Sequence, residues 1–168
     1  MTDPALNESS LLSATEPDWS REARRAFTWD PPRSLLKSIR DYQAATGRLS
    51  LFSKKAAVIR HRFWSIVTGA DIPINSSIGG GLLLPHPNGI VIHPGAQIGV
   101  NCLIFQQVTI GATRHGVPSI GGNVDIGAGA KIIGPVKIGA HARIGANAIV
   151  REDVPPRGTF VAASGHLL

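Results

Sequence analysis

The chain has 168 residues and a formal net charge of +6, with 17 Lys and Arg against 11 Asp and Glu. No stretch approaches the roughly 18 uncharged apolar residues that a membrane-spanning helix needs, and the single cysteine excludes an internal disulfide framework. Asp3 and Glu8 stand where a signal peptide would be basic. We therefore expect a cytoplasmic protein with one main domain and an N-terminal extension.

The first 70 residues contain no strand pattern. Residues 1–30 are rich in Ser, Glu, Asp and Pro, which predicts a mobile extension, or one that is ordered only against a partner. Two helices are predicted next, over 33–46 and 51–68, within a helical segment that spans 31–70. Each has an apolar stripe: Leu35, Leu36, Ile39 and Tyr42 on the first, and Val58, Ile59, Phe63, Ile66 and Val67 on the second.

Basic residues are concentrated on these two helices. Residues 33–62 hold eight Lys and Arg against one acid, Asp41. Such a patch suits nucleic acid, a membrane surface or an anionic ligand, although a solvated helix face is the commoner origin. No nucleic-acid-binding motif accompanies the patch, so we expect no nucleic-acid partner.

From residue 72 onward an aliphatic residue recurs every six positions, with two interruptions. These residues are Ile72, Ile78, Leu84, Ile92, Ile98, Ile104, Ile110, Ile120, Ile126, Ile132, Ile138, Ile144 and Val150. A strict period of six does not sustain the stripe of a helix. A second small or apolar residue stands two positions earlier in most repeats, for example Ala96, Cys102, Val108 and Ala130. Side chains two apart on a strand share a face, so each repeat predicts a short strand with two inward side chains.

Glycine follows many of the repeated aliphatic residues, and it supplies the backbone freedom that such frequent turns require. Three strands close one triangular coil, and stacked coils bury a continuous aliphatic core. A narrow prism has no room for Trp, and Trp19, Trp29 and Trp64 all lie outside the repeat. We predict a mainly β chain with a parallel β-helix of about four coils over 71–155, followed by a short tail over 156–168.

The two interruptions contain the candidate catalytic residues. The spacing rises to eight between Leu84 and Ile92, where His86 lies, and to ten between Ile110 and Ile120, where His115 lies. Because corners recur every three strands, these loops leave different corners of one prism and cannot converge within one chain. In a threefold trimer, one corner can face a different corner of the neighbouring subunit. The spacing therefore predicts a homotrimer with sites between subunits.

Asp71 stands 15 residues before His86, which is nearly one coil. We expect it to lie beneath His86 and to bond its second ring nitrogen, because a general base needs a fixed tautomer. The alternative is a charged residue that closes the preceding helix. The other histidines are assigned structural or surface positions: His93 structural, and His61, His141 and His166 on the surface.

Six segments carry a resemblance in their order and spacing. They are Asp71-Ile72, Leu84-Pro85-His86-Pro87-Asn88-Gly89-Ile90-Val91-Ile92, Val108-Thr109-Ile110-Gly111, Arg114-His115, Gly127-Ala128-Gly129-Ala130-Lys131-Ile132 and Val154-Pro155-Pro156. Over roughly residues 65–160 the chain resembles the hexapeptide-repeat acyltransferases, most closely the serine O-acetyltransferases of cysteine biosynthesis. The resemblance implies a left-handed parallel β-helix, a trimeric unit and acetyl-CoA as co-substrate. No metal is expected.

The resemblance also implies roles for single residues. His86 and Asp71 match the catalytic base and the Asp paired with it. Arg114 and His115 match a loop of the neighbouring subunit that helps to hold the acceptor, with the Arg at the serine carboxylate. The CoA groove between prisms is expected to be lined by Gly111, Ala112, Gly127, Ala128 and Ala146, with Arg143 at the phosphates.

Three departures from the family pattern have consequences. Pro85 replaces an Asp that contacts the amino-acid acceptor, and the loop after His115 has two more residues than the family's. The family's large N-terminal helical domain is reduced to two helices, so we expect a trimer rather than a hexamer. The tail stops at Leu168, so we expect neither tail-mediated feedback inhibition nor docking of the next enzyme.

We therefore expect an acetyl-CoA-dependent O-acetyltransferase that uses His86 as base in a ternary complex. L-serine is the first candidate acceptor, and a sugar or polysaccharide hydroxyl, which Pro85 favours, is the second. A zinc hydrase resembling the γ-type carbonic anhydrases would need two His ligands a few residues apart on one chain, whereas His86 and His93 are seven apart. A non-catalytic scaffold that binds through the basic helices is a third alternative.

Overall fold

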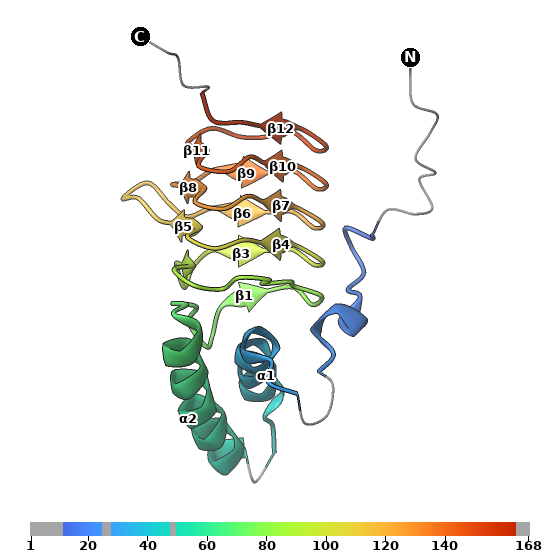
Figure 1. The fold of residues 1–168 in the computed structure, drawn as a ribbon, viewed down its shortest axis with the longest axis vertical. Coiled ribbons are helices and arrows are strands. Elements are labelled where there is room, and N and C mark those ends of the chain that lie inside the picture. Colours follow the sequence, from blue (N-terminus) through green and yellow to red (C-terminus); the bar gives the residue numbers. More distant parts are fainter. Residues whose placement is uncertain (1–11, 25–27, 48–49, 164–168) are drawn as a thin grey trace.

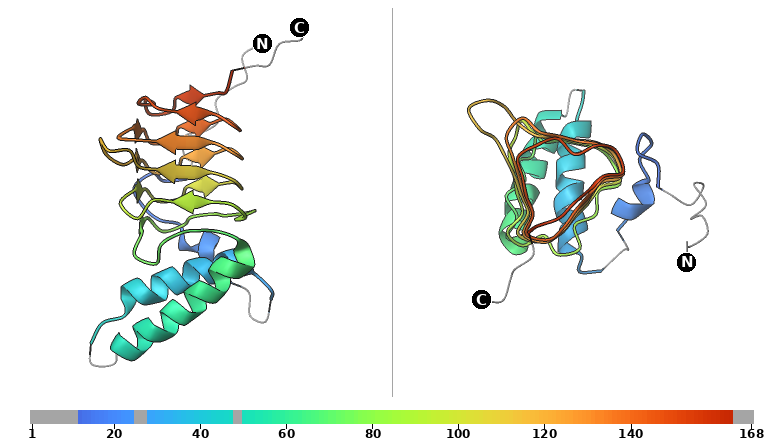
Figure 2. Two further views of the ribbon diagram at one scale, coloured as in Figure 1. Left: turned by 90° about the vertical axis from the view of Figure 1, so that its left-hand side faces the viewer. Right: turned by 90° about the horizontal axis from the view of Figure 1, so that it is seen from above.

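The computed structural model describes residues 12–24, 28–47 and 50–163. A triangular prism of stacked coils stands on two helices that pack side by side, α1 (Pro31–Ala44) and α2 (Ser50–Thr68) (Figure 1). A short 3-10 helix, η2 (Trp19–Glu22), lies beside the base of the prism. Seen along the prism, the coils superpose on one triangle (Figure 2). No helix among the described residues is long and apolar enough to cross a bilayer.

Three parallel sheets form the faces of the prism. Sheet 1 contains β1 (Ser77–Ile78), β3 (Gln97–Ile98), β6 (Ser119–Ile120) and β9 (Lys137–Ile138). Sheet 2 contains β2 (Val91–Ile92), β5 (Thr109–Gly111), β8 (Lys131–Ile133) and β11 (Ile149–Val150). Sheet 3 contains β4 (Leu103–Ile104), β7 (Asp125–Ile126), β10 (Arg143–Ile144) and β12 (Thr159–Phe160). Single bridges at Asp71, Leu83 and Val154 add one layer to each sheet. The predicted parallel β-helix is confirmed, and its faces are five layers high where about four coils were expected.

The repeated aliphatic residues point into the prism, as predicted. All of them are at most 8 % exposed, and so are the small or apolar residues two positions earlier. Equivalent residues stack in register, so that Ile110 pairs with Ile92 on one side and with Ile132 on the other. The second pairing spans the longer interruption, which shows that the inserted residues loop out without shifting the register. Fully burying each Ile is worth about 1.5–3 kcal/mol, so this stack is the main stabilising element.

Several corners of the prism need a left-handed backbone conformation that side chains rarely adopt. Asn occupies it at Asn101, Asn123 and Asn147, with φ of 59°, 53° and 56°. Asn tolerates this region better than most residues because its short amide finds hydrogen bonds locally. The turns therefore depend on Asn as well as on the glycines that the repeat pattern emphasised.

The described part of the N-terminal extension packs against the prism of its own chain. The Asn101 side-chain amide donates hydrogen bonds to the carbonyls of Ser13 and Glu16, both at 2.8 Å, and its oxygen accepts one from the Asp18 N–H at 2.8 Å. An ion pair between Glu22 and Arg40 at 2.8 Å continues this attachment to α1. Residues 1–11 and 25–27 lie outside the described residues.

Helix α1 closes the base of the prism. It begins after Asp30, whose carboxylate accepts a hydrogen bond from the Arg33 N–H at 3.2 Å, and two prolines occupy its first positions. Its predicted stripe is confirmed, because Leu35, Leu36 and Ile39 are buried in the same core as the coils. The helix lies two residues earlier at each end than the sequence predicted.

Most of the apolar stripe of helix α2 faces away from the core, unlike the stripe of α1. Its inward side is formed by Ala57, His61, Trp64 and Thr68, which are buried or half-buried. Ile59, Phe63, Ile66 and Val67 are exposed. A helical apolar stripe usually faces the core, whereas most of the stripe on this helix faces outward. Small Ala57 and the hydrogen-bonding side chains of His61 and Thr68 allow the less apolar side to pack instead.

Candidate active site

The His86 loop projects from the corner between sheets 3 and 2. Two backbone hydrogen bonds hold it, from the Gly89 N–H to the Gly69 carbonyl at 2.8 Å and from the Gln107 N–H to the Asn88 carbonyl at 3.0 Å. Gly89 has a φ of +70°, and a side chain there would collide with Gln107. The loop is thus fixed to the layers below and above it, while the His86 imidazole is exposed. An exposed imidazole on a fixed loop is available to a ligand.

Asp71 lies in the layer beneath this corner. It forms a parallel bridge with Val91, and the Ile92 N–H donates to the Asp71 carbonyl at 2.9 Å. The segments that carry Asp71 and His86 are therefore stacked, as their spacing suggested. No hydrogen bond joins the two side chains in the described part of the chain, so the carboxylate–imidazole pair stays a prediction.

His61 of α2 was expected on the surface but supports the Asp71 segment. Its ring is half-buried, and Nε2 donates to the Ile72 carbonyl at 2.8 Å. Burial lowers the pKa of His61, and the bond to Ile72 and the charge of Asp71 oppose that shift. The expectation of a surface histidine is wrong because His61 shares the inward side of α2 with Ala57 and Trp64. Helical spacing groups His61 with Ala57 and Trp64, but it does not indicate that this side of the helix packs.

The His115 loop projects from a different corner, between sheets 2 and 1, and extends outward from the triangle (Figure 2). Thr113 and Gly116 exchange backbone hydrogen bonds of 2.9 and 3.2 Å that close a tight turn. Within it, the Arg114 Nε donates to the His115 Nε2 at 2.9 Å, and both side chains are exposed. The prediction that the two interruptions leave different corners is confirmed.

The residues expected along a CoA groove divide between the same two corners. Gly127, Ala128 and Ala146 belong to turns stacked above the His86 loop, where the Asn147 N–H donates to the Ala128 carbonyl at 2.8 Å. These turns lie close together, because a side chain at Gly127 would come within 2.6 Å of the Ala146 nitrogen. Gly111 and Ala112 begin the His115 loop. Each corner therefore combines a histidine with a surface formed largely by backbone.

Arg143 lies near the first of these corners, on sheet 3. Its strand β10 is paired between Asp125 of β7 and Thr159 of β12, and its side chain is exposed. Its neighbour Ile144 points into the prism and is 3% exposed. Arg143 lies two residues before the Gly145-Ala146 turn.

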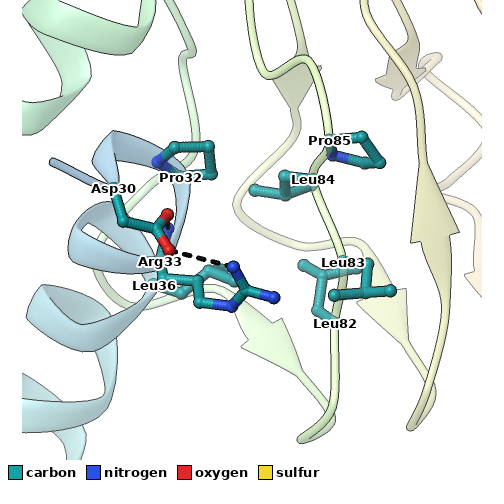
Figure 3. A pocket seen from close by; sticks show the side chains of 8 residues that line it. All are labelled: Asp30, Pro32, Arg33, Leu36, Leu82, Leu83, Leu84 and Pro85. Carbon is teal, nitrogen blue, oxygen red and sulfur yellow. Dashed lines mark hydrogen bonds and ion pairs between the residues drawn. The ribbon is translucent and has the colours of Figure 1, made fainter. Parts of the chain in front are cut away.

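A hollow of about 390 Å³ lies at the start of the His86 loop (Figure 3). Its lining consists of Asp30, Pro32, Arg33, Leu36, Leu82, Leu83, Leu84 and Pro85. Arg33 and Asp30 form an ion pair at 2.9 Å on the helix side, opposite the apolar side chains of the coil. Pro85 thus faces a space where the family pattern would place a carboxylate.

Neither a metal-ligand cluster within one chain nor an exposed thiol occurs among the described residues. Among them, no group of three His, Cys, Asp or Glu side chains is placed to hold a metal ion. Cys102 is buried, and burial raises the pKa of its thiol to about 11. A thiolate at neutral pH is therefore disfavoured, which agrees with the packing role predicted for Cys102.

Comparisons with known proteins identify the family. The model described as bacterial transferase hexapeptide (six repeats) matches residues 118–152. A serine acetyltransferase of Staphylococcus aureus is 36% identical over 163 residues, which cover 88% of this chain and 76% of the relative. The chain belongs to the serine acetyltransferase family. This confirms the resemblance on which the sequence interpretation rests.

Other family members are similar over shorter parts of their length. The serine acetyltransferase of Mycobacterium tuberculosis is 41% identical over 112 residues, covering 63% of this chain and 48% of the relative. The serine acetyltransferase of Synechococcus elongatus is 39% identical over 109 residues, covering 61% of this chain and 44% of the relative. The chain thus spans about half the length of these two relatives.

Solved serine acetyltransferases share the fold. The Neisseria gonorrhoeae enzyme in complex with serine has a TM-score of 0.66 at 35% identity, covering 79% of this chain and 55% of that chain. Serine acetyltransferase isoform 3 of Entamoeba histolytica in complex with cysteine has a TM-score of 0.68 at 28% identity, covering 82% of this chain and 50% of that chain.

The contact between His61 and the Asp71 segment predicts a pH dependence of stability. Because the pKa of His61 is lowered in the folded state, its stabilisation is full above its ordinary value of 6.5 and is lost as the pH falls through the folded value. We expect the free energy of unfolding to fall more steeply on acidification in the wild type than in His61→Gln, which keeps a donor for Ile72. Urea unfolding at a series of pH values measures this, and parallel curves would contradict it.

Proposed function

We propose that the chain is an acetyl-CoA-dependent O-acetyltransferase whose acceptor is L-serine. The supporting observation is the placement of His86 on one corner of the prism and of Arg114-His115 on another, in a chain of the serine acetyltransferase family. In this role the protein acts in the cytoplasm, in the biosynthesis of cysteine.

His86 is the proposed general base. Its imidazole removes the proton of the acceptor hydroxyl, and the resulting oxygen nucleophile attacks the thioester carbonyl of acetyl-CoA. Collapse of the tetrahedral intermediate breaks the carbon–sulfur bond, and the proton on the imidazole goes to the departing thiolate. Asp71 in the layer beneath keeps the imidazole in the required tautomer. A positioned base of this kind contributes about 10²–10⁴-fold to the rate.

A trimer supplies the second half of the site. The His86 corner of one subunit faces the His115 corner of the next, so that His115 reaches the acceptor from the opposite side. Arg114 pairs with the serine carboxylate, where a charge-assisted hydrogen bond is stronger than a neutral one. Its present bond to His115 places the guanidinium next to the ring that would share the acceptor.

Acetyl-CoA lies in the groove between the two prisms. One wall is formed by Gly127, Ala128 and Ala146, and the other by Gly111 and Ala112 of the neighbouring subunit. These residues have at most one side-chain carbon, so an extended ligand can approach the backbone closely. Arg143 supplies positive charge for the phosphates. Binding both substrates in one groove provides much of the acceleration, because reacting groups held together react as in a unimolecular step.

Replacement of His86 by Ala tests the mechanism. We expect kcat to fall about 10²–10⁴-fold while acetyl-CoA still binds, because the base is lost but the groove is unchanged. CoA release with serine as acceptor measures the rate, and calorimetry measures acetyl-CoA binding. His141→Ala, which removes an imidazole from another corner, serves as the control. Undiminished CoA release by the His86 variant would refute the mechanism.

A sugar hydroxyl is the second candidate acceptor, and Pro85 is the observation that favours it. The family's carboxylate at this position is replaced by an apolar ring that borders a hollow of about 390 Å³. This space is larger than the serine side chain requires, and the acid in its lining, Asp30, is already paired with Arg33.

Comparing acceptors separates these two candidates. We expect faster CoA release with L-serine than with any of a panel of sugars at equal concentration. Pro85→Asp should raise kcat/KM for serine by about tenfold, since a hydrogen bond to a charged group contributes roughly 1.5 kcal/mol or more. Turnover of a sugar without turnover of serine would instead assign the chain to sugar O-acetylation.

A further inference from the structure

Helix α2 carries an exposed apolar face on the side that points away from α1. Its large members are Phe52, Ile59, Phe63 and Ile66, with 71, 70, 53 and 82% of their surface exposed. Ile59, Phe63 and Ile66 recur at intervals of four and three residues, and Phe52 lies seven residues before Ile59, which places all four on one side of the helix. We call this set the outer face of α2. It is about 20 Å long at 1.5 Å per residue.

Positive charge borders the outer face. Lys55 lies four residues before Ile59, and Arg62 lies four residues before Ile66, so both cations are on one flank of the face. Neither makes an ion pair among the described residues. Asp41 is the one acid within residues 33–62, and it already forms ion pairs with Lys37 and Arg60 at 2.8 Å each. Helix α2 itself contains no Asp or Glu.

Aromatic rings extend the apolar surface beyond the outer face. Phe63 packs edge-on against Trp64 with ring centroids 4.9 Å apart, and Trp64 packs in the same way against Trp29 at 5.5 Å. Trp29 is 73% exposed. The helix lies at the base of the prism, at the end opposite β12, so the coils do not cover it (Figure 1). Indole rings of this kind favour the boundary between water and lipid.

The charge pattern distinguishes between two occupants of this face. A second copy of the same helix, related by a twofold axis perpendicular to the helix, would bring the Lys55 and Arg62 flank against the same flank of its partner, and α2 has no acid to neutralise it. An anionic lipid surface attracts every one of these cations while the apolar side chains enter the headgroup region. Long Lys and Arg side chains can extend toward phosphates while their stems stay among apolar groups.

We propose that the outer face of α2 docks the protein on membranes that contain anionic phospholipid, with the helix lying in the plane of the interface. This inference does not depend on the acetyltransferase activity. It assigns a function to Lys55 and Arg62 of α2, which the proposed active site does not use.

Vesicle co-sedimentation tests the proposal with the full chain. One set of vesicles contains phosphatidylcholine alone, and the other contains phosphatidylcholine with phosphatidylglycerol. We expect binding to the second set only, and we expect salt to weaken it. Lys55→Gln with Arg62→Gln should lower the partition constant by roughly tenfold or more, because each cation near an anionic surface contributes about fivefold.

Matched variants distinguish the outer face from the rest of the surface. Ile59→Ser with Ile66→Ser should abolish vesicle binding, whereas Val161→Ser, another exposed aliphatic residue, and Lys137→Gln, an exposed cation on the prism, should not. Because Ile59 and Ile66 are exposed, thermal unfolding of the double variant should match that of the wild type.

Two outcomes overturn the proposal. The first is absence of binding to phosphatidylglycerol vesicles at low salt, or binding that the Ile59 and Ile66 substitutions leave unchanged. The second is a lower oligomeric mass of the Ile59 and Ile66 double variant by light scattering, which would show that a second copy covers the outer face. Binding that is lost in the variant at unchanged mass supports the proposal.

Discussion

Aliphatic side chains stacked in register along the prism determine where everything else lies. Each inward Ile rests on its equivalents in the coils below and above, as Ile98 does between Ile78 and Ile120. A slip of one residue would turn the inward side chains outward, so the register is strongly determined. Insertions are therefore tolerated only at corners, where they loop out and leave the pairing intact. The two longest insertions carry His86 and His115, and this constraint sends them to different corners.

The proposed site follows from this separation. The His86 corner and the His115 corner lie on the two sides of sheet 2, so one chain offers two half-sites. Each is built on turns locked to neighbouring layers by backbone hydrogen bonds, such as the 2.8 Å bond between Gly89 and Gly69. Rigid half-sites suit a reaction that depends on holding two substrates in line. In the proposed homotrimer, a half-site of one subunit joins the other half-site of the next.

The sequence predicted the repeat well because a strand has a side-chain period of two, which makes inward positions visible without knowledge of the partner strand. Residues such as Val108 and Ala130 are buried as expected. It failed where a residue's role depends on a distant segment. His61 bonds the Ile72 carbonyl, and Asn101 binds a segment more than 80 residues earlier, and no local pattern indicates either contact. Helical spacing located the stripe of α2 but contained nothing about which side would pack.

The shared site is the central claim, and mixed trimers test it most directly. Co-expression of the His86→Ala chain with an Arg114→Ala, His115→Ala chain places, in each mixed trimer, one intact His86 corner against one intact His115 corner. If the two corners form one site, the two inactive variants recover about a quarter of wild-type CoA release when they mix at random in a trimer. Recovery of no activity, with mixed trimers verified by differential tags, would show that the two corners do not form one site.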